Sequence, residues 1–186
     1  MASSNATSEA DVASDPPRSR TTVRILGVDP GLRITGYGLI EVDGPSTRLI
    51  EGGVIRIRED APLADRLAGL HRDMSQVIDD LEPTMVAVES VFTHPERAGT
   101  GVRMAHARGV ILLAAAQRRL PVREHAPAQV KKSLTGDGSA GKDRMQAAVA
   151  SVCGLDHPPE PPDVADALAI ALCSANRLHD PLDIAE

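Results

Sequence analysis

Hydrophobic and polar positions along the chain form short apolar runs followed by longer amphipathic stretches, a pattern typical of strands alternating with helices. Three runs rich in β-branched residues come first and span residues 23–29, 35–42 and 47–57. The first run ends at Asp-Pro-Gly, where Pro30 favours extended geometry at Asp29 and Gly31 permits a turn. A polar turn, EVDGPS, separates the second run from the third. The pattern predicts an antiparallel three-stranded meander.

A helical periodicity follows the meander. Large apolar residues recur at spacings of three and four across residues 62–83, which predicts an amphipathic helix that ends at Pro83. A short apolar strand then runs over residues 84–90. We further expect a long helix, a final strand and three more helices, at residues 101–120, 121–125, 128–134, 143–152 and 162–178. This order predicts an α/β fold in which a mixed five-stranded sheet carries helices on both faces.

The length of 186 residues suits one globular domain, which we place at residues 23–178. A polar, Ser- and Ala-rich stretch at residues 1–22 predicts a disordered N-terminal extension without a signal peptide, and residues 179–186 form a C-terminal tail. The longest fully apolar run, residues 109–116, is too short to span a membrane. Cys153 and Cys173 lie far apart and are expected to be reduced core thiols. We therefore expect a cytoplasmic protein with no membrane partner.

Charge is distributed unevenly along the chain. The formal net charge is −6, yet residues 97–144 contain ten Lys and Arg against three acidic residues, a net charge of +7. Beyond Leu155 only one base, Arg177, faces seven acids. The basic stretch therefore favours phosphate binding, although a solvated charged face is the other interpretation.

Four acidic residues stand where strands end or a helix begins. Asp29 and Glu89 end two apolar strands, while Asp163 and Asp166 lie one turn apart on one face of the last helix. If the first and fourth strands are neighbours, these side chains converge, and two carboxylates ~4 Å apart repel by about 4 kcal/mol at a surface-like dielectric. A hard divalent cation, Mg²⁺ or Mn²⁺, removes that penalty. Taken singly, Asp163 also suits the helix macrodipole and Asp29 also suits a turn.

Four segments together resemble the RuvC family of Holliday-junction resolvases over residues 23–178: RILGVDPGLRITGYGLIE, VAVESVF, QVKKSLTGDGSAGK and PPDVADALAIALC. The resemblance implies an RNase H-like (retroviral integrase-like) fold. It also implies a homodimer that nicks two like-polarity strands of a four-way DNA junction, leaves 5′-phosphate and 3′-hydroxyl ends, and acts with a branch-migration motor. Asp29, Glu89, Asp163 and Asp166 match the family's catalytic metal ligands, which implies two Mg²⁺ ions per site, with Mn²⁺ as a substitute.

The same resemblance implies roles for residues that contact DNA. Phe92 matches an aromatic residue that stacks on an unpaired base at the crossover, although a core position is the other interpretation. Lys131 and Lys142 match basic residues near the scissile phosphate, and Arg97 and Arg103 of the basic stretch are expected to bind DNA.

Two rival interpretations remain open from sequence. The segment LGVDPGLRITGYGLIE also resembles the first phosphate loop of actin-like sugar kinases, but the chain has no second such hairpin. A non-catalytic junction-binding scaffold would keep the basic stretch and would not need all four acids.

Overall fold

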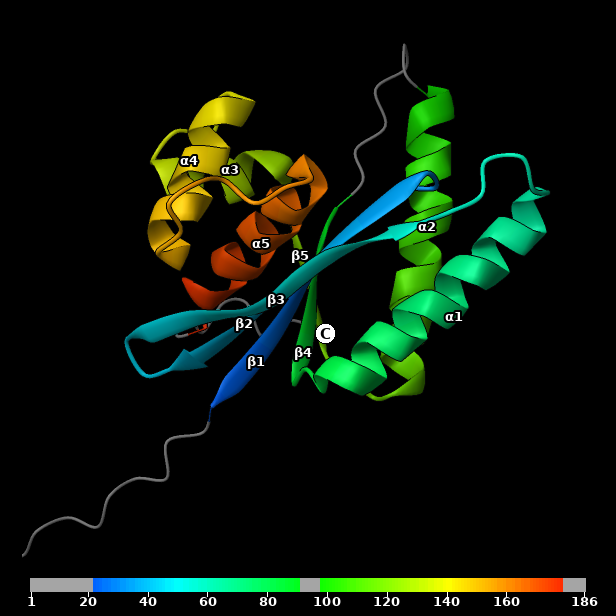
Figure 1. The fold of residues 1–186 in the computed structure, drawn as a ribbon, viewed down its shortest axis with the longest axis horizontal. Coiled ribbons are helices and arrows are strands. Elements are labelled where there is room, and N and C mark those ends of the chain that lie inside the picture. The colour runs from blue at the N-terminus through cyan, green and yellow to red at the C-terminus, as the bar shows by residue number, and fades with distance from the viewer. Residues whose placement is uncertain (1–21, 91–97, 179–186) are drawn as a thin grey trace, which may run out of the picture.

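A five-stranded sheet with the order β3-β2-β1-β4-β5 forms the centre of the structure, a computed structural model that describes residues 22–90 and 98–178 (Figure 1). The strands are β1 (Val23–Asp29), β2 (Ile34–Asp43), β3 (Ser46–Arg56), β4 (Met85–Glu89) and β5 (Val122–His125). β1, β2 and β3 pair antiparallel, which confirms the predicted meander, whereas β4 runs parallel to β1 and to β5. The predicted tail and all but Thr22 of the predicted extension lie outside the described residues.

Helices cover both faces of this sheet, as predicted. They are α1 (Leu63–Leu81), α2 (Ala98–Gln117), α3 (Pro127–Thr135), α4 (Lys142–Cys153) and α5 (Pro162–Ala175). In Figure 1, α1 and α2 lie on one side of the sheet, and α3, α4 and α5 lie on the other. α1 ends at Leu81 and is capped by Glu82, which has a left-handed φ of 42° and is followed by Pro83, so the predicted stop is confirmed. α5 ends three residues earlier than expected, at Ala175.

The central strands are apolar on both faces because each face carries helices. In β1, Ile25 belongs to the core cluster around α5, whereas Leu26 and Val28 belong to the cluster beneath α1 and α2. β4 alternates in the same way, with Ala87 on the α5 side and Val88 on the other. This double burial explains why both strands are continuous apolar runs.

Glycines let α5 lie unusually close to the sheet. A Cβ on Gly27 of β1 would lie 2.1 Å from the carbonyl oxygen of Ala167, and one on Gly36 of β2 would lie 2.1 Å from that of Asp163. Both distances are far inside van der Waals contact, so any side chain here would push the helix outward. The first turns of α5, with their two aspartates, therefore sit directly on β1 and β2.

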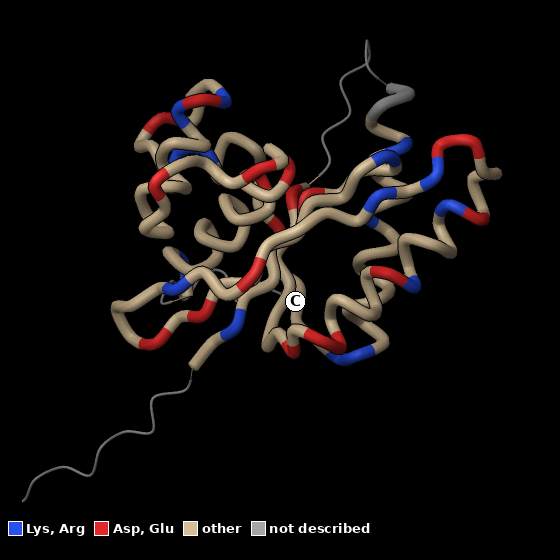
Figure 2. The backbone as a smooth tube through the Cα atoms, viewed as in Figure 1, with Lys and Arg blue, Asp and Glu red and all other residues tan. Residues whose placement is uncertain are grey.

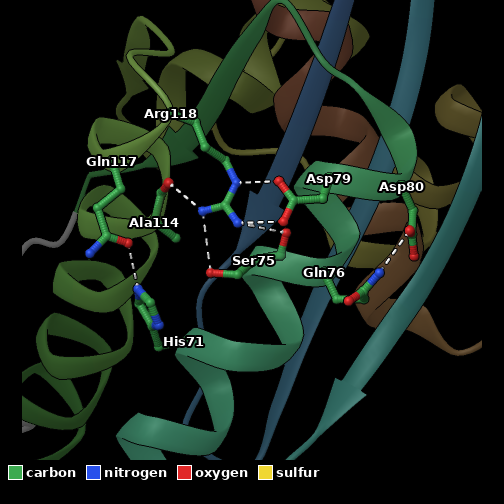
Figure 3. A network of polar contacts seen from close by, with 8 residues as sticks. All are labelled: His71, Ser75, Gln76, Asp79, Asp80, Ala114, Gln117 and Arg118. Carbon is green, nitrogen blue, oxygen red and sulfur yellow. Dashed lines mark hydrogen bonds and ion pairs between the residues drawn. The ribbon is translucent and has the colours of Figure 1, made fainter.

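Arg118 joins α2 to α1 and is a structural residue. Its guanidinium donates two hydrogen bonds of 2.6 Å to the carboxylate of Asp79 and further bonds to the carbonyl oxygens of Ala114 and Ser75 (Figure 3). His71 of α1 also pairs with Gln117 of α2 at 2.8 Å, as the same view shows. These contacts fix the two helices side by side at the polar edge of their interface.

Three other arginines of the basic stretch are also held by internal partners. Arg108 pairs with Glu124, Arg123 donates to the carbonyl oxygen of Ser174, and Arg144 donates to that of Thr135. The interpretation of the whole +7 stretch as a phosphate-binding region is therefore only partly right. Much of that charge holds helices and strands together, because a guanidinium can serve several carbonyl and carboxylate acceptors at once.

Neither Cys153 nor Cys173 forms a disulfide, as expected for reduced thiols. Cys173 is fully buried in the core around α5, but Cys153 at the end of α4 is only half-buried and packs against that core from its edge. Among the helices that the structure describes, none has the length and apolar character needed to cross a membrane.

The close approach of α5 predicts opposite outcomes for two glycine substitutions. We expect Gly27→Ala to lower the free energy of unfolding by about 1–3 kcal/mol or more, because its methyl group collides with the α5 backbone. Gly69→Ala on α1 is the control, since a Cβ there meets only the end of the Arg72 side chain, at 3.8 Å, and it should raise stability by up to about 1 kcal/mol. Urea denaturation measures both. Equal midpoints for Gly27→Ala and the unmodified chain would show that the close approach is not required.

Candidate active site

Two carboxylates meet at one end of the sheet because their strands are parallel neighbours. Val28 of β1 is the register partner of Val88 of β4, and Asp29 and Glu89 are the residues that follow. Both strands therefore deliver an acidic side chain at the same edge, where the apolar core ends. The condition on which the sequence prediction depended, that the first and fourth strands lie side by side, is met.

α5 brings two more carboxylates to this edge. Gly36 is the register partner of Asp29 and contacts the backbone of Asp163, so the start of α5 lies over the end of β1. Asp163 and Asp166 are half-exposed, whereas Val164 and the rest of the helix up to Ser174 are buried. Figure 2 shows acidic positions gathered at this end of the sheet, with basic positions on either side.

Three of the four acids share one cleft with two lysines. Asp29, Glu89 and Asp166 line a cleft of about 280 Å³ whose opposite wall carries Lys131 of α3 and Lys142 at the start of α4. Lys142 Nζ lies 3.2 Å from Asp166 Oδ2, so an ammonium group already stands against the carboxylates. The remaining lining is apolar and comes from α3, α4 and α5, which limits the water around the charged groups.

Asp163 opens instead into a second cleft of about 520 Å³. Arg33, Arg66 and Arg103 line this cleft together with Asp163. The acidic cluster therefore lies between two clefts, and each contains basic side chains. Arg103, which the sequence analysis expected to bind DNA, is thus placed beside the acids.

Burial and neighbouring carboxylates disfavour the ionised state of Asp29 and Glu89. Desolvation raises the pKa of Asp29 from 3.8 to about 7, with smaller contributions from the charges of Asp166, Glu89 and Asp163, while Lys142 acts in the opposite direction. The pKa of Glu89 is also raised, first by burial and then by Asp166, while Lys131 acts in the opposite direction. Such perturbed carboxyl groups in a cleft are typical of catalytic or metal-binding sites.

The donor set fits a hard divalent cation by its chemistry. All four candidate ligands are carboxylates, which Mg²⁺ and Mn²⁺ prefer, and the cluster already attracts one cation in the form of the Lys142 ammonium. Within the described ranges, no group of three or more Asp, Glu, His or Cys side chains is already arranged around one point as a metal cage.

Several residues that position this site were not anticipated from sequence. His125 is the register partner of Glu89 and forms a buried hydrogen bond of 2.6 Å with Ser174, which ties β5 to α5. Gly36 allows the start of α5 to pack against β2. The sequence pattern that indicates this contact is the alternation of glycines in Thr-Gly-Tyr-Gly, which leaves one face of the strand without side chains. Of the predicted DNA-binding residues, Phe92 and Arg97 lie outside the described residues.

The mixed sheet, its helical layers and the carboxylates at the shared end of β1 and β4 define an RNase H-like α/β protein. The chain belongs to the RuvC family: the family model described as "Crossover junction endodeoxyribonuclease RuvC" matches residues 25–174. This membership contradicts the sugar-kinase interpretation.

Curated and solved relatives agree with this assignment. The crossover junction endodeoxyribonuclease RuvC of Rhodopirellula baltica is 45% identical over 159 residues, 86% of this chain and 89% of its own. The Thermus thermophilus RuvC solved in complex with Holliday junction substrate is 33% identical, with a TM-score of 0.78, covering 84% of this chain and 94% of that one. The yeast mitochondrial Holliday junction resolvase shares the fold at 13% identity, with a TM-score of 0.60, covering 86% and 82% of the two chains.

The raised pKa of Asp29 predicts a pH dependence of stability in metal-free solution. The pKa of Asp29 is about 7 in the folded state and 3.8 ordinarily, so the folded state binds the proton more tightly than the unfolded chain does. The protonated carboxyl group therefore contributes its full stabilisation below about pH 4, and this contribution is lost as the pH rises through 7. Asp29→Asn should remove this loss and leave the protein more stable than the unmodified chain at pH 8, by on the order of 1–3 kcal/mol. Thermal or urea unfolding across pH 4–8 in EDTA measures the effect.

The matched control is Asp43→Asn, which changes an exposed carboxylate at the opposite end of the sheet. It should leave the pH profile unchanged. If stability changed with pH in the same way for Asp29→Asn and for the unmodified chain, Asp29 would not be a buried carboxylate with a raised pKa at the end of β1.

Proposed function

We propose that this chain is a metal-dependent endonuclease that resolves four-way DNA junctions by nicking two strands of like polarity in recombination and repair. The observation that carries the proposal is the carboxylate cluster at the shared end of β1 and β4, faced by Lys131 and Lys142, in a chain of the RuvC family. The substrate is carried over from the Thermus thermophilus relative, whose structure contains a Holliday junction.

Asp29, Glu89, Asp163 and Asp166 would hold the metal, Mg²⁺ with Mn²⁺ as a substitute, at two positions around the scissile phosphate. Bound divalent ions supply Lewis-acid chemistry, lowering the pKa of water and neutralising charge on the phosphate. The high pKa of Asp29 makes this carboxyl group a ligand whose affinity rises with pH, because it must lose its proton to bind a cation. The apolar helix behind Asp163 and Asp166 restricts their movement.

The lysines act on the DNA from the opposite wall of the cleft. Lys131 faces Glu89 closely enough to influence its pKa, and Lys142 is paired with Asp166. A phosphodiester lying between the two walls would be bound by both ammonium groups on one side and approach the carboxylates on the other. Attack of water on this phosphorus with rupture of the P–O3′ bond leaves a 5′-phosphate and a 3′-hydroxyl, ends that a ligase can rejoin.

Paired nicking requires two active sites, and the described residues of one chain contain a single carboxylate cluster. We assign the homodimer contact to α2, whose outer face exposes apolar side chains. Val102 is 51% exposed and Leu113 is 52% exposed, and they lie on one helical face with exposed Gly109 between them. A second copy packed against this face would bury both side chains.

The remaining roles rest on the family resemblance. Phe92 would stack on an unpaired base at the crossover, and Arg97 and Arg103 would contact the DNA backbone. A branch-migration motor would be the partner on the junction, and the cytoplasm would be the compartment. Residues 23–178 would form the nuclease domain between an N-terminal extension and a C-terminal tail.

Neutral replacement of the acids separates cleavage from binding. We expect Asp29→Asn, Glu89→Gln and Asp163→Asn each to lower the Mg²⁺-dependent cleavage rate by at least about a hundredfold, because each removes several kcal/mol of transition-state stabilisation. Binding of the junction in EDTA should persist, since affinity comes from Arg and Lys side chains. Cleavage gels and mobility shifts on a synthetic four-way junction measure both, with Asp43→Asn as the control. An unmodified chain that binds the junction without cutting it in Mg²⁺ or Mn²⁺ would support the scaffold interpretation.

The α2 contact predicts a change in oligomeric state. Leu113→Glu should shift the protein from dimer toward monomer, because it places a charge in an apolar contact, while leaving the fold intact. Leu63→Glu is the matched control, since Leu63 is a 44% exposed leucine at the start of α1 on another helix. Sedimentation equilibrium measures the state of each variant. Dimers of equal strength in both variants would place the contact elsewhere.

A further inference from the structure

The second cleft, on the far side of Asp163 from the lysines, is a basic site that the catalytic chemistry leaves without a role. Its basic side chains come from three separate elements: Arg33 from the turn between β1 and β2, Arg66 from α1, and Arg103 from α2. Residues so distant in sequence meet here only because the turn after Asp29 lies between the starts of these helices. The cleft, at about 520 Å³, is roomier than the cleft with the lysines.

Arg33 is held at the cleft in a way that leaves its guanidinium available. Its backbone carbonyl accepts a hydrogen bond of 3.0 Å from the amide of Ile57, so the turn is fixed against the end of β3. Its side chain pairs with Glu59 at 2.6 Å, but both side chains are mostly exposed, at 77% and 58%. An exposed ion pair contributes about 0–1 kcal/mol, so an incoming phosphate can take the guanidinium from Glu59 at small cost.

Arg66 supports the same turn from beneath. One end of its guanidinium donates to the carbonyl oxygen of Leu32, the residue before Arg33. Its Nε is buried and, among the described residues, has no hydrogen-bond partner. A buried donor without a partner is costly, and the positive charge of Arg66 adds to that of Arg33 and Arg103 around the cleft.

We infer that this cleft binds a backbone phosphate of the same DNA strand, next to the scissile phosphate. The inference rests on the proposed function, because the carboxylate cluster lies between the two clefts. A strand whose scissile phosphate lies between the acids and the two lysines reaches the second cleft with a neighbouring phosphate. Arg33 and Arg103 bind that phosphate, Arg66 positions the turn, and Glu59 competes with the phosphate for Arg33.

The test compares two charge-neutralising variants with a matched pair elsewhere on the sheet. Arg48 and Glu41 form a similar ion pair at 2.7 Å, with Arg48 72% exposed, on the β2–β3 hairpin away from both clefts. Binding of a four-way junction is measured in EDTA by fluorescence anisotropy over a range of salt concentrations. Arg33→Gln should weaken binding about three- to tenfold and reduce the slope of log affinity against log salt by about 1. Glu59→Gln should strengthen binding, while Arg48→Gln and Glu41→Gln should change neither quantity.

Neutral methylphosphonates in the DNA then locate the contact. Replacing one phosphate adjacent to the cleavage point should weaken binding by the unmodified chain more than binding by Arg33→Gln, because that variant has already lost the Arg33 part of the same contact. Two results would overturn the inference. One is that Arg33→Gln and Arg48→Gln change junction affinity equally. The other is that each methylphosphonate within three phosphates of the cleavage point weakens binding equally for the unmodified chain and for Arg33→Gln. Cleavage by the unmodified chain in Mg²⁺, measured in parallel, reports on the proposed function independently.

Discussion

The close contact between α5 and the sheet is the constraint on which the rest of the site depends. Gly27 and Gly36 leave no side chain between the strands and the helix, so the backbone of α5 rests directly on β1 and β2. This contact sets the distance of Asp163 and Asp166 from Asp29 and Glu89, which the parallel pairing of β1 with β4 brings together. A helix held farther out, at the ordinary spacing of a helix with larger contact residues, would move Asp163 and Asp166 away from Asp29 and Glu89.

The same close contact makes the carboxylate site, taken by itself, destabilising for the folded state. Burial and neighbouring carboxylates raise the pKa values of Asp29 and Glu89, so the fold works against their ionised forms. The apolar length of α5 and the hydrogen bond between His125 and Ser174 keep the helix in place despite this repulsion. Lys142 offsets part of the charge from across the cleft. In the proposed function, a divalent cation would relieve the repulsion that the fold has already imposed.

The basic residues divide into two groups by their partners in space. Arg108, Arg118, Arg123 and Arg144 are held by carboxylates or carbonyl oxygens and connect helices and strands. Lys131 and Lys142 line one cleft beside the acids, and Arg103 lines the other with two arginines from outside the basic stretch. Counting charges along the chain could not separate these groups. The distinction depends on whether an acceptor from another element lies within reach of each side chain.

Sequence alone determined the order of the elements and the family, and it singled out four acids as candidate ligands, because periodicity, turn residues and motif spacing are local properties. Asp29 and Glu89 were visible as acids ending apolar strands, and α5 as a buried helix opening with two acids. Tertiary structure decided that Asp163 opens into a separate cleft, that Arg118 connects α1 to α2, and that Arg33 and Arg66 meet Arg103. These relations join residues tens of positions apart, and the packing distances that bring them together exist only once helices are seated on the sheet.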